Sequence, residues 1–254
     1  MHPDFAEGAY DETSFWAARF GVLLFDNLDL RPGIVGLDVG CATGFPLFEL
    51  AHVHGPSSHF TGIDPWEPAI KRAERKLNVY GLENVALHAG DAADMPFDDQ
   101  SFDLITSNLG INNFDDPAAV LRECYRVARP GARIVLTTNL TGHLAEFYDL
   151  FRAATPEHAE AITRQEQHRG TRQSVEQQLT DAGFAMRKVV EDEFFARFAN
   201  GTAMFKHSLV QFFVEGWRTA VDDDAVYAKL ERQLNAASPL AFRVPMLYAE
   251  AVRR

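Results

Sequence analysis

Residues 34–51, with the sequence IVGLDVGCATGFPLFELA, constrain the fold more than any other part of the chain. The stretch begins with an apolar run typical of a buried strand, and an acid, Asp38, lies near the end of this run. Small residues follow, and then an apolar pattern typical of a helix. Glycine-rich turns between a strand and a helix usually bind a nucleotide, because glycine lets the backbone approach the ligand closely. The loop therefore predicts a ligand with a nucleotide part.

Strand-like and helix-like segments alternate from residue 34 to residue 139. Short apolar runs predict strands at residues 34–39, 59–64, 84–91, 101–109 and 132–140. Amphipathic segments predict helices at residues 46–53, 67–81 and 115–131, the last with Asp116 as its N-cap. This alternation favours a doubly wound α/β fold with a parallel sheet, in which ligands bind at the carboxyl ends of the strands.

The second half of the chain is richer in helices and in aromatic residues. The spacing of its apolar residues predicts helices at 142–154, 156–169, 174–183, 203–221 and 223–237. Two further strands are predicted at 184–194 and 241–253. Together with the five strands above, they give seven.

Two kinds of nucleotide loop can be compared with residues 38–45. The dinucleotide fingerprint G-x-G-x-x-G would need glycines at 40, 42 and 45, but Ala42 and Phe45 stand at two of these positions. A phosphate loop ending in Gly-Lys-Ser/Thr is absent. What remains is an acid followed by small residues at alternate positions, namely Asp38, Gly40, Ala42 and Gly44. This pattern resembles the first motif of the class I S-adenosylmethionine-dependent methyltransferases.

The resemblance continues, in the correct order, over about residues 33–140. Asp64 closes the second predicted strand, where the family places a carboxylate that can accept both ribose hydroxyls. Asp91 follows the third strand, where the family places an acid beside the adenine amino group. Residues 95–107, MPFDDQSFDLITS, and 120–138, VLRECYRVARPGARIVLTT, resemble the family's fourth and fifth strand regions. Five ordered motifs thus resemble the type 11-like, small-molecule group of this family.

The family resemblance implies both a fold and a cofactor. The fold is a Rossmann-like, mostly parallel sheet of seven strands with an antiparallel final strand, helices on both faces and helical cap insertions. The cofactor is S-adenosylmethionine, which leaves as S-adenosylhomocysteine. The residues expected to bind it are Asp38, Gly40, Cys41, Ala42, Gly44, Asp64, Pro65, Trp66, Asp91, Ala92 and Ser107. Simpler roles stay open for four of them: Asp38 as a strand-end acid that caps a turn, Asp64 as a helix cap, Asp91 as a turn residue and Trp66 as a packed surface aromatic.

Ala42 departs from the family pattern, because a glycine is expected at this position. Glycine there would permit an unusual backbone conformation and close approach to the cofactor. We therefore predict a negative φ at Ala42, with its methyl group turned away from the cofactor. A positive φ, or a methyl group that fills the cofactor space, would favour a catalytically silent relative.

In-line displacement of a methyl group from a sulfonium needs positioning and exclusion of water more than it needs catalytic side chains. A general base is required only if the nucleophile keeps its proton until late in the reaction. The catalytic residues are therefore unknown at this level, and the candidate bases are His143, followed by Tyr10 and Tyr148. No metal site is expected, since the two cysteines, Cys41 and Cys124, lack the spacing of metal ligands.

Charge and composition narrow the partners. A formal net charge of −12 disfavours a nucleic-acid substrate. No run of 18 apolar residues predicts a membrane span and the N-terminal residues do not resemble a secretory signal, so we expect a cytoplasmic protein. The expected acceptor is a small, apolar or aromatic molecule. The alternatives are a protein or RNA methyltransferase, or a catalytically silent S-adenosylmethionine-binding module, and the oligomeric state stays open.

We predict one methyltransferase domain over residues 1–254, with a cofactor-binding core at about residues 32–140. Segments 1–31, 141–170 and 195–238 are expected to form a helical cap on the substrate side. Their many aromatic residues favour an apolar pocket that closes over the acceptor. The competing interpretation is that aromatic residues at helical spacing, such as Phe205 to Trp217, are packed in a core.

Overall fold

The computed structural model describes residues 15–254, which divide into two compact units. Unit 1 comprises residues 15–138, Arg172–Glu191 and Leu247–Arg254, and unit 2 comprises Asn139–Thr171 and Asp192–Met246. The strands β6 (Phe184–Phe198) and β7 (Leu240–Arg253) each contribute residues to both units. Whether the helical segments outside 32–140 form a cap on the substrate side stays a prediction.

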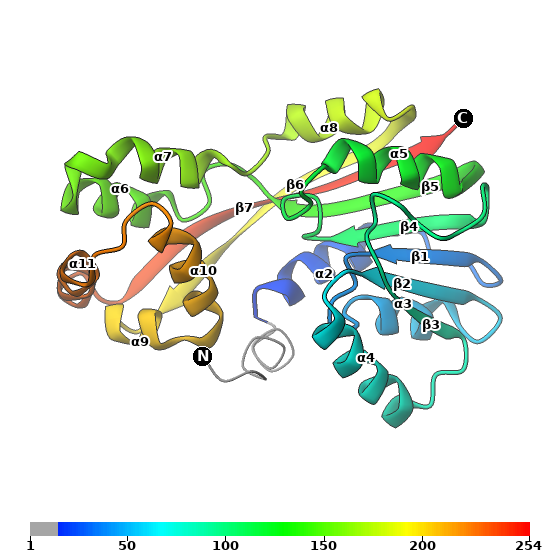
Figure 1. Ribbon diagram of the computed structural model, residues 1–254, viewed down its shortest axis with the longest axis horizontal. Coiled ribbons are helices and arrows are strands. Elements are labelled where there is room, and N and C mark those ends of the chain that lie inside the picture. The colour runs from blue at the N-terminus through cyan, green and yellow to red at the C-terminus, as the bar shows by residue number, and fades with distance from the viewer. Residues whose placement is uncertain (1–14) are drawn as a thin grey trace. The chain divides into compact units, whose positions relative to one another are not determined.

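A seven-stranded sheet has the strand order β3-β2-β1-β4-β5-β7-β6 (Figure 1). The strands β1 to β5 pair in parallel and the sheet becomes antiparallel towards its last strands, which confirms the predicted fold class. The bounds of these five strands are β1 Val35–Val39, β2 His59–Asp64, β3 Val85–Ala89, β4 Phe102–Asn108 and β5 Ala128–Asn139.

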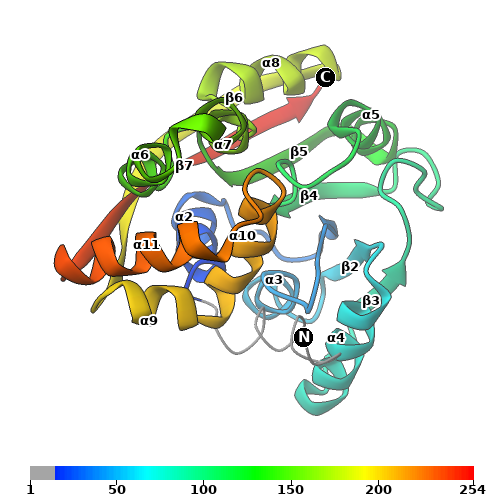
Figure 2. The ribbon, with the colours of Figure 1, turned by 60° about the vertical axis from the view of Figure 1, so that its left-hand side comes forward.

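The strand order reverses between β1 and β4, and this reversal positions the site. The chain moves outward in one direction through α3 (Leu47–His54), β2, α4 (Glu67–Tyr80) and β3. It moves in the other direction from β4 through α5 (Pro117–Val127) to β5 (Figure 2). Right-handed crossovers then place α3 and α4 on one face of the sheet and α5 on the other. A crevice at the carboxyl ends of β1 and β4 is where ligands bind in such sheets.

The helix α5 begins where the sequence predicts and ends earlier. The Asp116 carboxylate accepts a hydrogen bond from the Ala119 N–H at 2.9 Å, so Asp116 is the N-cap. The predicted end at residue 131 is wrong, because Ala128 takes an extended conformation and β5 begins there. Pro130 lacks an N–H and would also disrupt a helix, so a boundary before it is physically expected.

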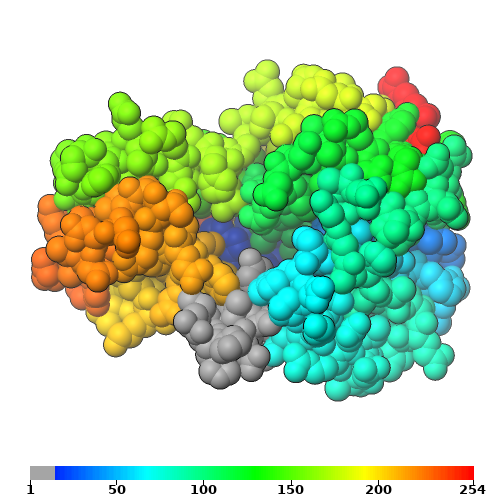
Figure 3. All heavy atoms as spheres, in the orientation of Figure 1, coloured from blue at the N-terminus to red at the C-terminus, as the bar shows by residue number. Residues whose placement is uncertain are grey.

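Two further helices belong to unit 1. The helix α2 (Ala17–Asn27) contacts β4 and buries Phe20 and Leu24, while α8 (Arg172–Asp181) contacts α5. Figure 3 shows α5 and α8 side by side at the surface, in green and yellow-green. Among residues 15–254, no helix combines the length and the apolar character that a membrane crossing requires.

Unit 2 is helical and has an aromatic interior. Its helices are α6 (Ala145–Ala154), α7 (Ala159–Gln167), α9 (Gly201–Lys206), α10 (Ser208–Arg218) and α11 (Asp224–Ala236), with a short 3-10 turn at Pro156–His158. Phe147 stacks on Trp217 with 4.3 Å between the ring centroids, and both rings are buried together with Phe151. Such rings stabilise the folded state mainly because their apolar area is removed from water. This cluster therefore forms the hydrophobic core of unit 2.

The predicted single helix over residues 203–221 is wrong, because the chain forms α9 and α10 there. His207 takes an extended conformation, with φ −69° and ψ 127°. Its Nδ1 atom accepts a hydrogen bond from the Leu209 N–H at 3.3 Å, so His207 caps α10. The apolar spacing continues across the break, since both helices turn apolar side chains inward, and periodicity therefore does not reveal it.

Candidate active site

The glycine loop after β1 is tied to the end of β2. The N–H groups of Gly40 and Cys41 both donate to the carbonyl oxygen of Ile63, at 2.9 and 3.3 Å. Gly40 has a φ of +76° and Gly44 a φ of +101°, both in the region that favours glycine. A Cβ atom on Gly44 would also lie 2.2 Å from the Phe48 ring. Two of the predicted glycine positions therefore have a backbone reason to be glycine.

Ala42 also has a positive φ, of +43°, and the predicted negative φ is wrong. Its N–H donates to Oδ2 of Asp64 at 2.9 Å, and this bond fixes the backbone in the left-handed region. A non-glycine residue there costs about 1 kcal/mol. The loop thus keeps the conformation of a glycine at a position that holds alanine. By the criterion set from the sequence, this outcome favours a catalytically silent relative.

Asp64 lies at the carboxyl end of β2 with both of its oxygens engaged. Oδ2 accepts the Ala42 N–H and Oδ1 accepts the Trp66 N–H, each at 2.9 Å. Burial raises the pKa of Asp64, and the two backbone hydrogen bonds oppose this rise. Trp66, and not Asp64, is the N-cap of α4. Each oxygen retains acceptor capacity, so the carboxylate is held firmly and can still accept further donors.

Asp38, near the end of β1, is the most deeply buried acid of the loop, with 1% of its surface exposed. Oδ1 accepts a hydrogen bond from the Thr106 hydroxyl at 2.7 Å, and Oδ2 has no partner among the described residues. The pKa of Asp38 is raised to about 7, chiefly by burial and in part by the nearby Asp64 charge. The hydrogen bond from Thr106 opposes this rise. A buried polar atom without a partner is costly, so Oδ2 is suited to a donor from a ligand.

Thr106 is a site residue that the sequence analysis missed. Asp38 and Thr106 are directly paired in the parallel ladder between β1 and β4. A polar residue within a predicted buried strand was the signal that could have found it, once the register of the two strands is known. Thr106 therefore acts on the loop through the orientation of Asp38.

Ser107 and the residues after β4 face the glycine loop across the point where the strand order reverses. The Ser107 hydroxyl donates to the carbonyl oxygen of Val39 at 2.7 Å, so its side chain is already used. A Cβ atom on Gly110 would lie 2.3 Å from that hydroxyl, and one on Gly40 would lie 3.6 Å from the Phe114 ring. The backbone of β1 and the segment after β4 are thus close at the point where the strand order reverses.

Asp91 follows β3 and is exposed. Its Oδ1 accepts the Ala93 N–H at 2.8 Å, which is the turn geometry of the simpler interpretation. Ala92 is buried, and the Gly90 N–H donates to the Asp64 carbonyl at 3.1 Å, so this turn lies beside the end of β2. The adenine role of Asp91 and Ala92 stays a prediction. Pro65 is exposed and Trp66 half-buried at the same edge.

Arg126, on α5, holds the segment after Asp91 and is a second residue that the sequence analysis missed. Its guanidinium donates to the carbonyl oxygens of Met95 and Phe97, at 2.9 and 2.7 Å. It also forms a two-point ion pair with Glu123, whose carboxylate accepts the Met95 N–H. A planar fork that bridges several acceptors orders a loop well, so Arg126 positions the 91–99 segment.

The candidate bases lie elsewhere in the chain. His143 is buried in unit 2, with its ring 5.7 Å from that of Tyr148. Burial, together with the charges of Arg169 and His168, lowers the pKa of His143 to about 3. The Tyr148 hydroxyl accepts a hydrogen bond from Trp217 at 3.0 Å, and burial raises its pKa. The low pKa makes His143 a weak base, and the raised pKa keeps Tyr148 protonated near neutral pH. Tyr10 lies outside the described residues.

The two cysteines have structural surroundings. Cys41 fills space beside Gly62, where a Cβ atom would lie 2.7 Å from its sulfur. Burial raises the pKa of both thiols, that of Cys124 to about 12, so neither is a reactive thiolate near neutral pH. Within residues 15–254, no three potential metal ligands of the His, Cys, Asp and Glu types gather in one place.

A family model described as a methyltransferase domain matches residues 30–233, which is most of the chain. The chain belongs to the methyltransferase domain family. The family resemblance seen in the sequence is thereby confirmed. The matched residues include the whole glycine loop, Asp64, Asp91 and the end of β4, so the candidate site described above lies within the methyltransferase domain.

Curated relatives match about half of this methyltransferase domain chain. The chain is 36% identical over 134 residues to the demethylmenaquinone methyltransferase of Anoxybacillus flavithermus, covering 51% of the chain and 56% of that protein. It is 38% identical over 131 residues to the nocamycin O-methyltransferase of Saccharothrix syringae, covering 51% of the chain and 47% of that protein. The chain spans about half the length of the curated relatives it matches.

The fold of the methyltransferase domain is also found among solved structures. The YcgJ protein from Bacillus subtilis superposes with a TM-score of 0.64 at 18% sequence identity, over 93% of this chain and 99% of that one. At this identity the likeness concerns the fold alone. It extends beyond residue 140, so the second half of the chain also has a counterpart in that structure.

Proposed function

We propose that this chain is an S-adenosylmethionine-dependent methyltransferase that transfers a methyl group by in-line displacement to a small acceptor. The observation that carries the proposal is the unpartnered, buried Oδ2 atom of Asp38 at the carboxyl end of β1. It lies beside a loop whose left-handed residues match the methyl-donor pattern at Gly40 and Gly44. Membership of the methyltransferase domain family supports the same conclusion.

The residues present fit the proposed cofactor. Asp38 offers a buried acceptor for an amino group, and Asp64 is held so that it can accept ribose hydroxyls. The Asp91–Ala92 turn is proposed for the adenine, with Pro65 and Trp66 beside it. Cys41, Ala42 and Ser107 contribute backbone and packing. When bound, S-adenosylmethionine supplies an activated methyl group on its sulfonium sulfur. The chain's part is to bind, to orient and to exclude water.

The acceptor is proposed to be a small, apolar or aromatic molecule. The two curated relatives are named for demethylmenaquinone and nocamycin, and both are small molecules rather than macromolecules. The net charge of −12 also counts against an RNA substrate. We assign no catalytic base, because His143 and Tyr148 are buried and have pKa values that disfavour proton abstraction.

Calorimetric titration with S-adenosylmethionine and S-adenosylhomocysteine tests the cofactor. We expect both to bind the full chain. If neither binds, the proposal is overturned.

Release of S-adenosylhomocysteine is then measured with a panel of quinols, phenols and other small apolar acceptors. Turnover with one of them supports a small-molecule methyltransferase. The turnover of the His143→Ala variant is compared with that of the natural chain at saturating acceptor. Unchanged turnover excludes a catalytic role for His143.

The second candidate function is a catalytically silent S-adenosylmethionine-binding module. The positive φ of Ala42 is the observation that favours it. The two functions differ in one measurable respect, because a silent module binds the cofactor and releases no S-adenosylhomocysteine with any acceptor. Ala42→Gly restores the family residue without changing the loop conformation. If Ala42→Gly gains turnover that the natural chain lacks, the silent module is the correct description of the natural chain.

A further inference from the structure

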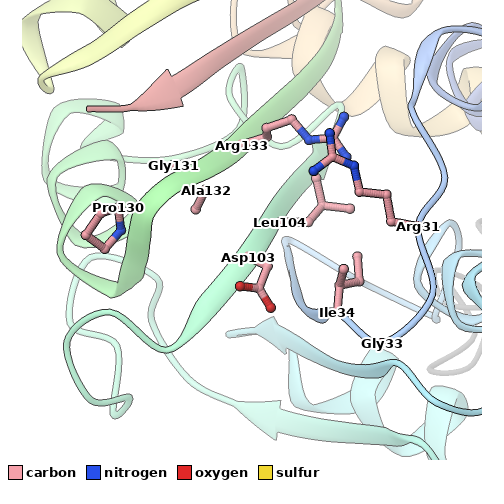
Figure 4. A pocket seen from close by; sticks show the side chains of 9 residues that line it. All are labelled: Arg31, Gly33, Ile34, Asp103, Leu104, Pro130, Gly131, Ala132 and Arg133. Carbon is pink, nitrogen blue, oxygen red and sulfur yellow. The ribbon is translucent and has the colours of Figure 1, made fainter.

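A concave site lies in unit 1 at the amino ends of the central strands, opposite to the glycine loop. It is a cavity of about 270 Å³ lined by nine residues, among them Arg31, Gly33, Asp103, Gly131 and Arg133 (Figure 4). These residues precede β1 or lie near the starts of β4 and β5, whereas the glycine loop follows the end of β1. Because β1, β4 and β5 are parallel, the cavity lies at the amino ends of these strands and the proposed cofactor site at their carboxyl ends.

One wall of the cavity is a bulge in β5. Ala128 pairs with Phe102 and Arg133 pairs with Leu104, so residues 129–132 lie opposite the single residue Asp103. Gly131, within the bulge, has a φ of +81°, and Gly33, before β1, has a φ of +71°. A Cβ atom built on either glycine would meet no other atom within 4 Å. Backbone around left-handed residues of this kind can form concavities that bind anions.

The acids near the cavity already have basic partners. Asp103 accepts the Val35 N–H at 2.9 Å and forms an ion pair with Arg129 at 2.8 Å. The buried Glu250 forms an ion pair with Arg187 at 2.8 Å and lies 3.5 Å from Arg133. No acid lining this cavity is therefore left to neutralise a further arginine.

The two arginines of the cavity differ in their surroundings. The Arg133 guanidinium is 6% exposed and is held by the side chain and carbonyl oxygen of Asp29, at 3.2 and 2.9 Å. Arg31 is exposed, and its side chain forms no hydrogen bond or ion pair with the described residues. Figure 4 shows the two side chains reaching towards the same part of the cavity, one from the segment before β1 and one from β5. Arg133 is a fixed cation, while Arg31 is a cation available to a ligand.

We propose that this cavity binds a small phosphate-type oxyanion between Arg31 and Arg133. The planar guanidinium fork matches phosphate geometry, and a pair of forks recognises it better than point charges do. The volume is just below the range of about 300–1,000 Å³ that is typical of pockets for larger ligands, so a small ion or a small phosphorylated compound fits it. This site is independent of the proposed function, since it shares no residue with the cofactor site.

Titration of the full chain with inorganic phosphate, at constant ionic strength set with chloride, tests the site. We expect chemical-shift changes at the Gly33, Gly131 and Ala132 amides, and a rise in Tm with phosphate concentration by mass action. Arg31→Gln is expected to weaken phosphate binding about tenfold, the loss typical of one charge-assisted hydrogen bond. Arg75→Gln, which removes a charge from another exposed arginine, on α4, is the matched control and is expected to leave binding unchanged.

The outcomes separate the possibilities. Absence of shifts at the three amides up to millimolar phosphate would overturn the proposal, as would equal effects of Arg31→Gln and Arg75→Gln. The same titration with glycerol 3-phosphate identifies the source of the phosphate group. Tighter binding of inorganic phosphate assigns the cavity to the free ion, and equal or tighter binding of glycerol 3-phosphate assigns it to a phosphorylated metabolite.

Discussion

Asp38 is the residue in which burial and function conflict most directly. Its pKa is raised to about 7, chiefly by burial, so near neutral pH the free protein holds it partly protonated. A ligand amino group at Oδ2 would favour the ionised form and lower this pKa. We therefore expect the affinity for S-adenosylhomocysteine to fall about tenfold per pH unit below about pH 7. Calorimetry between pH 5.5 and pH 8.5 measures this, and a flat profile would remove Asp38 from the site.

Asp38→Asn is expected to separate binding from stability. The pKa of Asp38 in the unfolded chain is about 4, and below that pH the carboxyl is protonated in both the folded and the unfolded state. Between about pH 4 and pH 7, the folded state keeps a proton that the unfolded state has lost. Stability is therefore lost as pH rises through this window. The variant is expected to be more stable at pH 8 by about 1–3 kcal/mol, and to bind the cofactor at least tenfold more weakly. Denaturant titration and calorimetry measure the two effects, with the exposed Asp26→Asn as control.

Ala42→Gly is expected to stabilise the loop. A residue with a Cβ atom at φ +43° is strained, and glycine is not, so the variant should gain about 0.5–1 kcal/mol in the free energy of unfolding. This gain is partly offset because glycine makes the unfolded chain more flexible. Ala51→Gly, within α3, is the control and is expected to destabilise. Equal losses for both variants would show that the Ala42 backbone is not left-handed in solution.

Arg126 connects two elements of unit 1, because its side chain joins α5 to the segment after Asp91. Arg126→Gln removes the bonds to Met95, Phe97 and Glu123 without touching the proposed cofactor contacts. We expect cofactor affinity to fall several-fold while the circular dichroism of the chain is unchanged. Arg122→Gln, an exposed position on the same helix, is expected to have no effect. Equal affinities of the two variants would show that this segment does not contribute to binding.

Elements with strong local signals follow the sequence predictions closely. The helix α4 ends at Tyr80, before Gly81 in a left-handed conformation, and α5 begins after its Asp116 cap, both at residues whose chemistry determines the boundary. The break at His207 and the start of β5 at Ala128 were not predictable from apolar spacing. In both cases the apolar pattern continues while the backbone changes. The places of Asp38 and Asp64 near the carboxyl ends of two strands were predictable, but the Thr106 and Arg126 contacts depend on strand register and on distant segments.

At the scale of the whole molecule, the proposed cofactor residues all fall within unit 1, while His143 and the aromatic core of Phe147 and Trp217 fall within unit 2. S-adenosylhomocysteine alone is therefore expected to slow amide hydrogen exchange at residues 38–44, 64–66 and 105–108. Exchange in α6 and α10 is expected to be unchanged by S-adenosylhomocysteine. Protection that begins in unit 2 with S-adenosylhomocysteine alone would contradict this assignment of the cofactor site.

The strand order has a consequence for biosynthesis. β7 lies between β5 and β6, although it comes after both in the chain, and residues 247–251 within it are buried. During translation, β5 and β6 therefore emerge from the ribosome before their common neighbour, and each has an edge without its partner strand. The sheet can close only once residue 253 has been synthesised and has left the exit tunnel.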